Sequence, residues 1–297
     1  MLASLPWWLF AIVFSIGFAA FMLLNQQMKL RADLMIAWRG IILTLLFTPL
    51  GFFLDLPQAP GYYLAVIAVG FAACFTDMRV LRATAEVGGG PVSRLMPISV
   101  WVSFGLWTAI DGAYRERLVA TPAQTAGVLG CLILCVLAVS MLRKDKVSQQ
   151  ALPLIIPIII GGAIIDNLNK FAMSFAAPDQ LLDAALGYIW LQNITIALIM
   201  GGRMVFDRGW VWREDMFARR LLIGSAMLAF IIGSITVVRN FAMAGAPNPG
   251  YVGAIGLGAT VLVILFNRWQ KVTDDSKIWA GLAFVASAVM LVILTSS

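Results

Sequence analysis

The sequence carries one nine-residue pattern twice, VLRATAEVG at residues 80–88 and VVRNFAMAG at residues 237–245. The two copies share valine, arginine, alanine and glycine in register, and their arginines, Arg82 and Arg239, lie 239 − 82 = 157 residues apart. Each copy ends a long apolar run, where charged residues are rare and usually functional if the run spans a membrane. The repeated arginine therefore indicates a duplicated membrane protein.

The composition also indicates a membrane protein. Hydrophobic residues make up 61% of the 297 residues and charged residues 12%, against about 45–50% and about 25% in globular domains. A membrane-spanning helix needs about 20 apolar residues. Runs of about this length predict an all-α polytopic protein with ten transmembrane helices, at 6–25, 33–54, 62–86, 91–110, 121–142, 152–176, 181–206, 217–243, 249–268 and 277–295.

The breaks between these runs predict an internal repeat. Residues 88–91 (GGGP) separate the third and fourth predicted helices, and residues 245–250 (GAPNPG) separate the eighth and ninth. The helices then form two repeats of five, residues 1–147 and 148–297, within one membrane domain. Because five is odd, the second repeat is inverted relative to the first, an arrangement found in many secondary transporters.

The distribution of lysine and arginine predicts the orientation in the membrane. The odd-numbered loops carry Lys29, Arg31, Arg143, Lys144, Lys146, Arg203, Arg208, Arg213, Arg219, Arg220, Arg268, Lys271 and Lys277. The even-numbered loops and the termini carry only Arg115 and Arg117. Since short cytoplasmic loops collect basic residues, we expect an inner-membrane protein with both termini outside.

The third predicted helix contains Asp77, Arg79, Arg82 and Glu86. Each charge near the bilayer centre costs about 2.5–3.5 kcal/mol, so these residues must be paired, hydrated or near an interface. Arg82 and Glu86 are four residues apart and can pair on one helix face. A simpler alternative is that this pair reaches the headgroups from the helix end. Asp77 is too deep in the helix for a short side chain to reach water, except in a cavity.

The second half contributes Asp166, Asn167 and Lys170 from the sixth helix, and Arg239 and Asn240 from the eighth. Arg239 has no acidic residue on its own helix, so its partner is Asp166, Asp77 or an anionic ligand. Alternatively, Asp166 and Lys170 satisfy each other, because they are four residues apart in the favourable order.

The chain resembles the drug/metabolite transporter superfamily, in its ten-helix EamA-like branch. The resemblance covers nearly the whole chain and rests on the two five-helix halves, on AWRG at residues 37–40, and on RATAEVG at residues 82–88 with Pro91 and Pro97 after it. Where family members often carry a glutamate at the end of helix 4, this chain has Asp111. Many members are also drawn with both termini in the cytoplasm, against the charge count here. The resemblance implies a central cavity surrounded by helices 1, 3, 4, 6, 8 and 9, with helices 5 and 10 peripheral or forming a homodimer contact.

We therefore expect a secondary transporter that moves a small polar metabolite by alternating access. Counting all the candidate charges gives a slight positive excess, which favours an amino acid, an organic anion or another zwitterion. Proton coupling through Asp77 or Glu86 is an additional expectation, and replacing Arg82 or Arg239 should abolish transport. The alternative is a broad exporter of drugs or toxic amino acids with an aromatic cavity.

Other classes of function have little support in the sequence. There is no histidine, and no catalytic or phosphate-binding motif, so we expect neither an enzyme nor a cofactor or metal site. The three cysteines lie in apolar runs. The basic residues are dispersed over short loops, which suits contact with the lipid bilayer and gives no basis for nucleic-acid binding.

Overall fold

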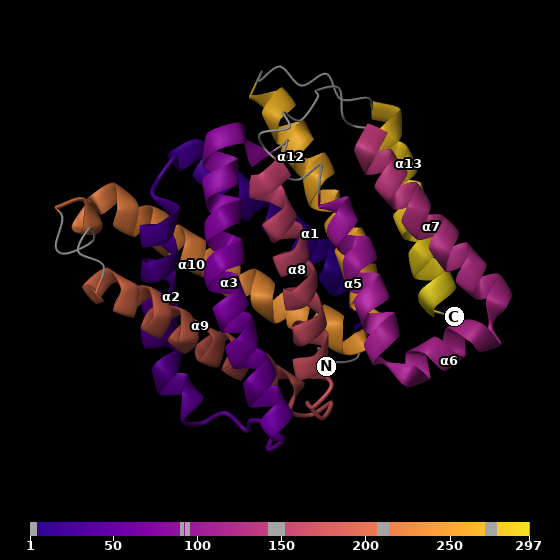
Figure 1. Ribbon diagram of the computed structural model, residues 1–297, viewed down its shortest axis with the longest axis horizontal. Helices are drawn as coiled ribbons and strands as arrows, with labels where there is room; N and C mark the ends of the chain where they lie inside the picture. The colour runs from indigo at the N-terminus through magenta and orange to yellow at the C-terminus, as the bar shows by residue number, and fades with distance from the viewer. Residues whose placement is uncertain are drawn as a thin grey trace.

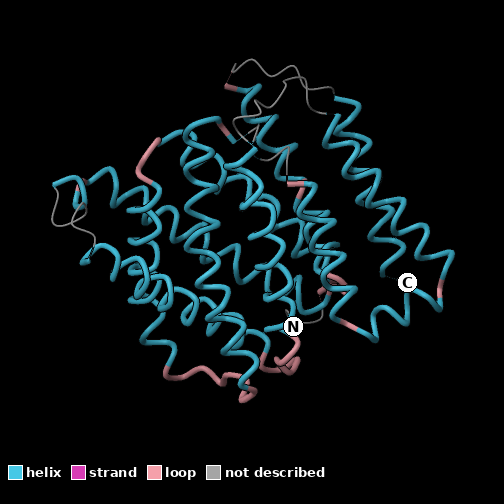
Figure 2. Tube along the Cα trace, viewed as in Figure 1, coloured by secondary structure: helices cyan, strands magenta, loops and turns pink. Residues whose placement is uncertain are grey.

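The computed structural model of the protein describes residues 5–89, 92, 96–141, 152–206, 214–270 and 278–296. Within these ranges all regular secondary structure is helical (Figures 1 and 2). The elements are α1 (Trp7–Met28), α2 (Ala32–Gly51), α3 (Pro60–Val87), α5 (Pro97–Ile110), α6 (Gly112–Ala120), α7 (Pro122–Met141), α8 (Leu152–Met173), α9 (Leu181–Phe206), η3 (Glu214–Phe217), α10 (Arg219–Gly245), α11 (Pro249–Gly256), α12 (Gly258–Trp269) and α13 (Ile278–Ser296).

The helix lengths and hydropathy identify a multi-pass membrane protein. In the described part of the chain, seven helical segments are long and apolar enough to cross a membrane, and the bent pair α6 and α7 would make an eighth. Each of the ten predicted runs contains helix, but α5 and α13 are shorter than this criterion requires. The boundary between the predicted repeats, at residues 147 and 148, and the predicted start of the fourth run at residue 91 lie outside the described residues.

The short helix α6 and the break between α11 and α12 were not predicted from the sequence. The short helix α6 precedes α7 at an angle of 107°, because Thr121 leaves the helical region before Pro122. The side chain of Asp111 caps α6 by accepting a hydrogen bond of 3.0 Å from the Tyr114 backbone N–H. The ninth predicted run is broken at Leu257 between α11 and α12, within a stretch containing Gly253, Gly256 and Gly258.

The most extensive helix contacts join α1 to α10, α3 to α8, α2 to α9, and α7 to α13. Figure 1 shows α7 and α13 side by side at one edge of the molecule, with α6 linking them to α5. Every one of these pairs joins a helix of the first predicted half to one of the second. The two halves therefore interdigitate and share one core.

Two glycines allow helices to approach closely in that core. A Cβ atom at Gly17 of α1 would overlap the Ile235 side chain of α10, and one at Gly161 of α8 would overlap the Thr76 side chain of α3. By contrast, a Cβ at Gly162 would meet no atom within 4 Å. Small residues at such crossings let membrane helices approach and gain van der Waals contact.

We expect Gly161→Ala to lower the free energy of unfolding by about 1–3 kcal/mol, the usual cost of adding a methyl group to a packed contact. The branched Thr76 side chain has little freedom to move away. Gly162→Ala is the matched control and should cause little change. Thermal unfolding of both variants in one detergent measures the difference, and equal melting temperatures would contradict the close approach.

Candidate functional site

A cavity of about 140 Å³ lies between helices from both halves of the chain. We call it the central cavity. Its wall comes from α1, α3, α5, α8, α10, α11 and α12, with Gln192 from α9: Phe14, Phe18, Phe21, Met22, Ala73, Thr76, Asp77, Val80, Met96, Ser99, Ile158, Gly162, Ile165, Asp166, Gln192, Ile232, Ile235, Thr236, Arg239, Gly253, Gly256, Leu257, Ala259 and Thr260. Apart from α9, these are the helices that the family resemblance implies around a central cavity.

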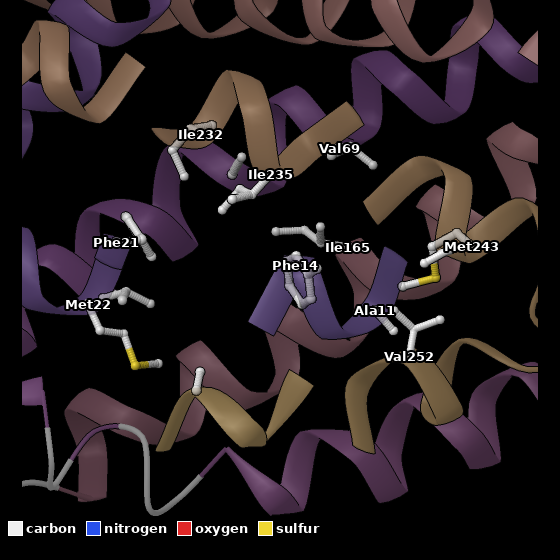
Figure 3. Close-up of a cluster of buried hydrophobic side chains, with 14 of the residues drawn as sticks. Ala11, Phe14, Phe21, Met22, Val69, Ile165, Ile232, Ile235, Met243 and Val252 are labelled. Carbon is white, nitrogen blue, oxygen red and sulfur yellow. The ribbon is translucent and has the colours of Figure 1, made fainter. Parts of the chain in front are cut away.

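One wall of the central cavity is aromatic. The lining residues of α1 are Phe14, Phe18, Phe21 and Met22, at a spacing that places them on one helix face. Neighbouring phenylalanine rings in this row are stacked, with centroids 5.5 and 5.8 Å apart. Figure 3 shows Phe14 with apolar side chains of α8 and α10 around the same space. This wall can hold an apolar or aromatic group.

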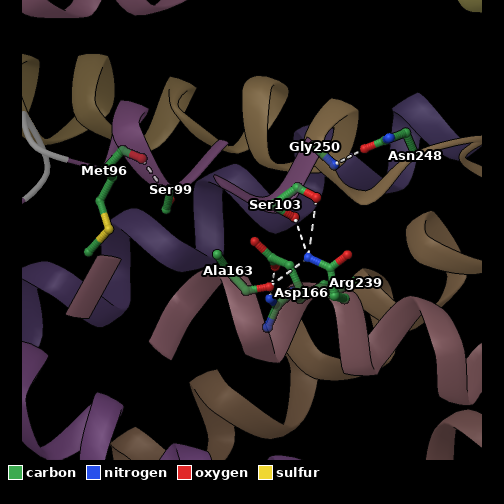
Figure 4. Close-up of polar contacts among 9 residues, drawn as sticks. Met96, Ser99, Ser103, Ala163, Asp166, Arg239, Asn248 and Gly250 are labelled. Carbon is green, nitrogen blue, oxygen red and sulfur yellow. Dashed lines mark hydrogen bonds and ion pairs between the residues drawn. The ribbon is translucent and has the colours of Figure 1, made fainter. Parts of the chain in front are cut away.

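Arg239 and Asp166 form an ion pair at the wall of the central cavity. The side chains are 19% and 14% exposed, and the Arg239 guanidinium lies 5.4 Å from the centroid of the Phe14 ring. Figure 4 shows the pair beside Ser103 of α5. Asp166 was one of the two acidic partners expected for Arg239, and the alternative pairing of Asp166 with Lys170 is wrong. The pair places both signs of charge next to the aromatic wall.

A second ion pair joins Arg39 of α2 to Asp77 of α3, with 2.6 Å between Nη1 and Oδ2. Asp77 lines the central cavity, which explains how a short acidic side chain is accommodated so deep in a membrane helix. Arg39 lies behind it with a fully buried side chain. Its Nε and Nη2 atoms have no hydrogen-bond partner. The sequence drew attention to Arg39 only through the family resemblance and did not indicate this pairing.

Three of the candidate residues on α3 lie away from the central cavity. Arg82 and Glu86 pair with each other at 2.8 Å, and their side chains are 68% and 50% exposed. Arg79 is half-buried and does not line the cavity. The expected Arg82–Glu86 pair is therefore present, but it lies on the exposed end of α3, as the simpler alternative supposed.

A difference in helix register explains why Arg239 faces the cavity and Arg82 does not. The cavity residues of α3 begin at Ala73 and end at Val80, and those of α10 begin at Ile232 and end at Arg239. Both sets follow the spacing i, i+3, i+4, i+7, at an offset of 239 − 80 = 159 residues. The repeated pattern has an offset of 157. The two offsets differ by two residues, and two residues turn a side chain by about 200° around a helix. Arg82 therefore points away from the cavity, whereas Arg239 lines it.

The remaining candidates have different surroundings. Asn167 is buried between α5 and α8, where its Nδ2 donates to the Ser103 carbonyl at 3.2 Å and the Ala163 carbonyl at 2.8 Å. Asn240 is fully buried, and neither its Oδ1 nor its Nδ2 has a partner. Lys170 lines a second cavity, in which its Nζ donates to the Ala244 carbonyl at 3.3 Å.

Helix α9 contributes two polar residues near the ion pairs. Gln192 lines the central cavity with its Oε1 unpartnered. Tyr188, one turn earlier, is fully buried with an unpartnered hydroxyl. The charges of Arg239, Asp166 and Asp77 all act on that hydroxyl. Sequence reasoning missed Tyr188, because a single tyrosine in an apolar run has no distinguishing pattern.

Among the residues that the structure describes, no three Cys, Asp or Glu side chains form a group that could hold a metal ion. The site offers two ion pairs, several amides and hydroxyls, and an aromatic wall.

No known family model matches the sequence, and no curated protein matches it either.

Proposed function

We propose that the protein is a secondary transporter of the drug/metabolite transporter superfamily, which moves a small polar metabolite across the inner membrane by alternating access. The observation that carries this proposal is the Asp166–Arg239 ion pair at the wall of the central cavity, between helices long enough to span a membrane. Charges at such depth usually mark a substrate or ion pathway. The absence of histidine and of catalytic motifs in the sequence favours transport over an enzyme.

An inverted repeat of two five-helix halves is part of this proposal, and the cavity faces support it. The cavity residues of α1 and α8 follow the same spacing, at an offset of 158 − 14 = 144 residues. The offset between α3 and α10 is 159. The same two offsets relate the two close glycine contacts. Gly17 and Gly161 are 144 residues apart, and their contact residues Ile235 and Thr76 are 159 residues apart. The contact of α1 with α10 thus has its counterpart in the contact of α8 with α3.

The charge balance of the site favours a zwitterionic substrate. The two ion pairs contain two arginines and two aspartates, so they carry no net charge. The positive excess counted from the sequence does not apply to the central cavity, because four of the seven charges in that count do not line it: Arg79, Arg82, Glu86 and Lys170. A zwitterion presents a carboxylate to Arg239 and an ammonium group to Asp166. The aromatic wall on α1 suits an apolar side chain, as in an aromatic amino acid.

The second candidate is an exporter of aromatic drugs or toxic amino acids, and the row of phenylalanines on α1 favours it. The size of the central cavity favours a small metabolite instead. Cavities for drug-sized ligands measure about 300–1,000 Å³, whereas this one measures about 140 Å³.

Three ligands that share a phenyl ring test the proposal: phenylalanine, phenylacetate and phenethylamine. We expect phenylalanine to bind at least about tenfold more tightly than the other two, since each lacks one charge-assisted hydrogen bond. Thermal shifts of the purified chain measure binding, and uptake of labelled phenylalanine into proteoliposomes measures transport. Equal binding of all three would favour the exporter, and no uptake of phenylalanine or other small zwitterions would contradict the proposal.

The orientation and assembly are also proposals. The charge bias of the loops supports termini on the outside. The helices α7 and α13 pack on each other at the edge of the molecule (Figure 1), which leaves their outer faces for lipid or for a second copy in a homodimer.

A further inference from the structure

A second cavity, of about 370 Å³, lies where α1 begins and where α8 and α10 end. We call it the vestibule. It is lined by Leu5, Trp7, Phe10, Lys170, Met173, Ser174, Ala176, Pro178, Leu181, Phe241, Ala244 and Gly245. The vestibule is thus an apolar and aromatic space with a single lysine.

The vestibule lies further along α1, α8 and α10, three of the helices that line the central cavity. On α8 the central cavity ends at Asp166 and the vestibule begins at Lys170, and on α10 Arg239 is followed by Phe241. Four helical residues rise about 6 Å, so the Lys170 backbone lies about one turn beyond that of Asp166. The Asp166–Arg239 ion pair therefore stands between the two spaces.

Lys170 has no ion-pair partner among the described residues. Its Nζ makes one long hydrogen bond to the Ala244 carbonyl, of 3.3 Å, and lies 5.9 Å from the centroid of the Trp107 ring. The charge of Asp111 acts on it through space, but the Asp111 side chain caps α6. An ammonium group with so few partners can still bind an anion strongly, since charge-assisted hydrogen bonds are the strong ones.

Several buried polar side-chain atoms on α5, α8 and α10 have no hydrogen-bond partner. Asn169 of α8 and Asn240 of α10 are buried, and neither side-chain amide has a hydrogen-bond partner. The Arg239 Nε atom and the Trp107 indole nitrogen, both buried, also lack partners. Buried polar atoms without partners are rare in folded proteins. Of these residues Arg239 lines the central cavity, so its Nε can donate a hydrogen bond to a carboxylate that enters there.

We infer that the vestibule is a second binding station, in which Lys170 holds the carboxylate of the substrate while Trp7, Phe10 and Phe241 surround its apolar part. The Asp166–Arg239 pair is the gate between this station and the central cavity. The substrate carboxylate passes from Lys170 to Arg239 when that pair opens. This inference rests on the proposed transport function, because a second substrate site of this kind is expected only in a protein that moves its substrate across the membrane.

Protection of Lys170 from acetylation tests the station directly. The full chain is placed in phosphatidylcholine nanodiscs and treated with acetic anhydride, with and without benzoate as the probe carboxylate, and each lysine is followed by mass spectrometry. We expect benzoate to slow acetylation of Lys170 at least about fivefold, through a charge-assisted contact with its amine. Lys29, an exposed lysine at the other end of α1, should be unaffected.

Transport kinetics give an independent measurement of the same station. With phenylalanine as the probe, Lys170→Met should raise the KM for uptake about tenfold, the loss expected for one charge-assisted contact. Lys170→Arg should retain most of the affinity, and the control Lys29→Met should not change it.

The outcomes separate the station from the proposed function. Normal phenylalanine uptake without benzoate protection of Lys170 would overturn the station and leave the transporter intact. Protection without uptake of any zwitterion would overturn the proposed function and leave only an anion site. If phosphatidylglycerol in the nanodisc protects Lys170 and benzoate then adds nothing, the site binds a lipid headgroup and the inference is wrong.

Discussion

Arg239→Ala is expected to abolish transport and to lower the free energy of unfolding by about 3–5 kcal/mol, the usual cost of removing one partner from a buried ion pair. Asp166, with a side chain only 14% exposed, would then keep a negative charge next to the aromatic wall without compensation. The substrate carboxylate would also lose its proposed partner. Thermal unfolding and phenylalanine uptake in proteoliposomes measure the two effects separately.

The double substitution Asp166→Leu with Arg239→Met separates stability from transport. Replacing a whole buried ion pair by apolar residues is often neutral or stabilising, so most of the lost stability should return while transport stays absent. If the double variant transports normally, the pair is not part of the substrate site.

The matched control for Arg239→Ala is Arg82→Ala, at the arginine that occupies the same place in the repeated sequence pattern. The Arg82–Glu86 pair is exposed, and such pairs contribute about 0–1 kcal/mol. We therefore expect near-normal stability and normal transport, in place of the loss that the sequence alone predicted for this substitution. Equal defects in the two variants would contradict the difference in register between α3 and α10.

Much of the fold could be predicted from the sequence because apolar runs of membrane length have a strong local signal. The short helix α6 has no such signal, because it is much less apolar than the helices on either side of it. The break at Leu257 has a weak signal, because the chain is apolar on both sides of it. For the site, the depth of Asp77 in its helix indicated a cavity, and the lack of an acid near Arg239 indicated a partner on another helix. Both inferences depend on the cost of a charge in the membrane.

The rest of the site depends on facts that a single sequence does not contain. Arg39 and Asp77 are 38 residues apart and on different helices, so no local spacing reveals their contact. The repeated pattern aligned Arg82 with Arg239, but helix rotation decides which side chain faces the cavity. An error of two residues in an otherwise correct alignment is enough to place one arginine outside.

Asp77→Asn should change the preference of the site between substrates as well as its stability. The substitution leaves Arg39, which has a fully buried side chain, with an uncompensated positive charge behind the central cavity. We expect a loss of about 3–5 kcal/mol in the free energy of unfolding. The folded variant should bind phenylacetate more tightly relative to phenylalanine than the wild type does, because the site now carries a net positive charge.

The control for Asp77→Asn is Asp33→Asn, in which the same chemical change is made to an exposed pair. Arg31 and Asp33 lie 2.7 Å apart, and their side chains are 41% and 21% exposed. Unlike Arg39, Arg31 is in contact with water, which replaces the lost interaction, so we expect a cost of at most about 1 kcal/mol. Thermal unfolding compares the two variants, and competition between phenylacetate and phenylalanine measures the preference. If Asp77→Asn leaves the preference unchanged while Arg239→Ala removes binding, then Asp77 serves only to neutralise Arg39, and the charge of the substrate is read by the Asp166–Arg239 pair alone.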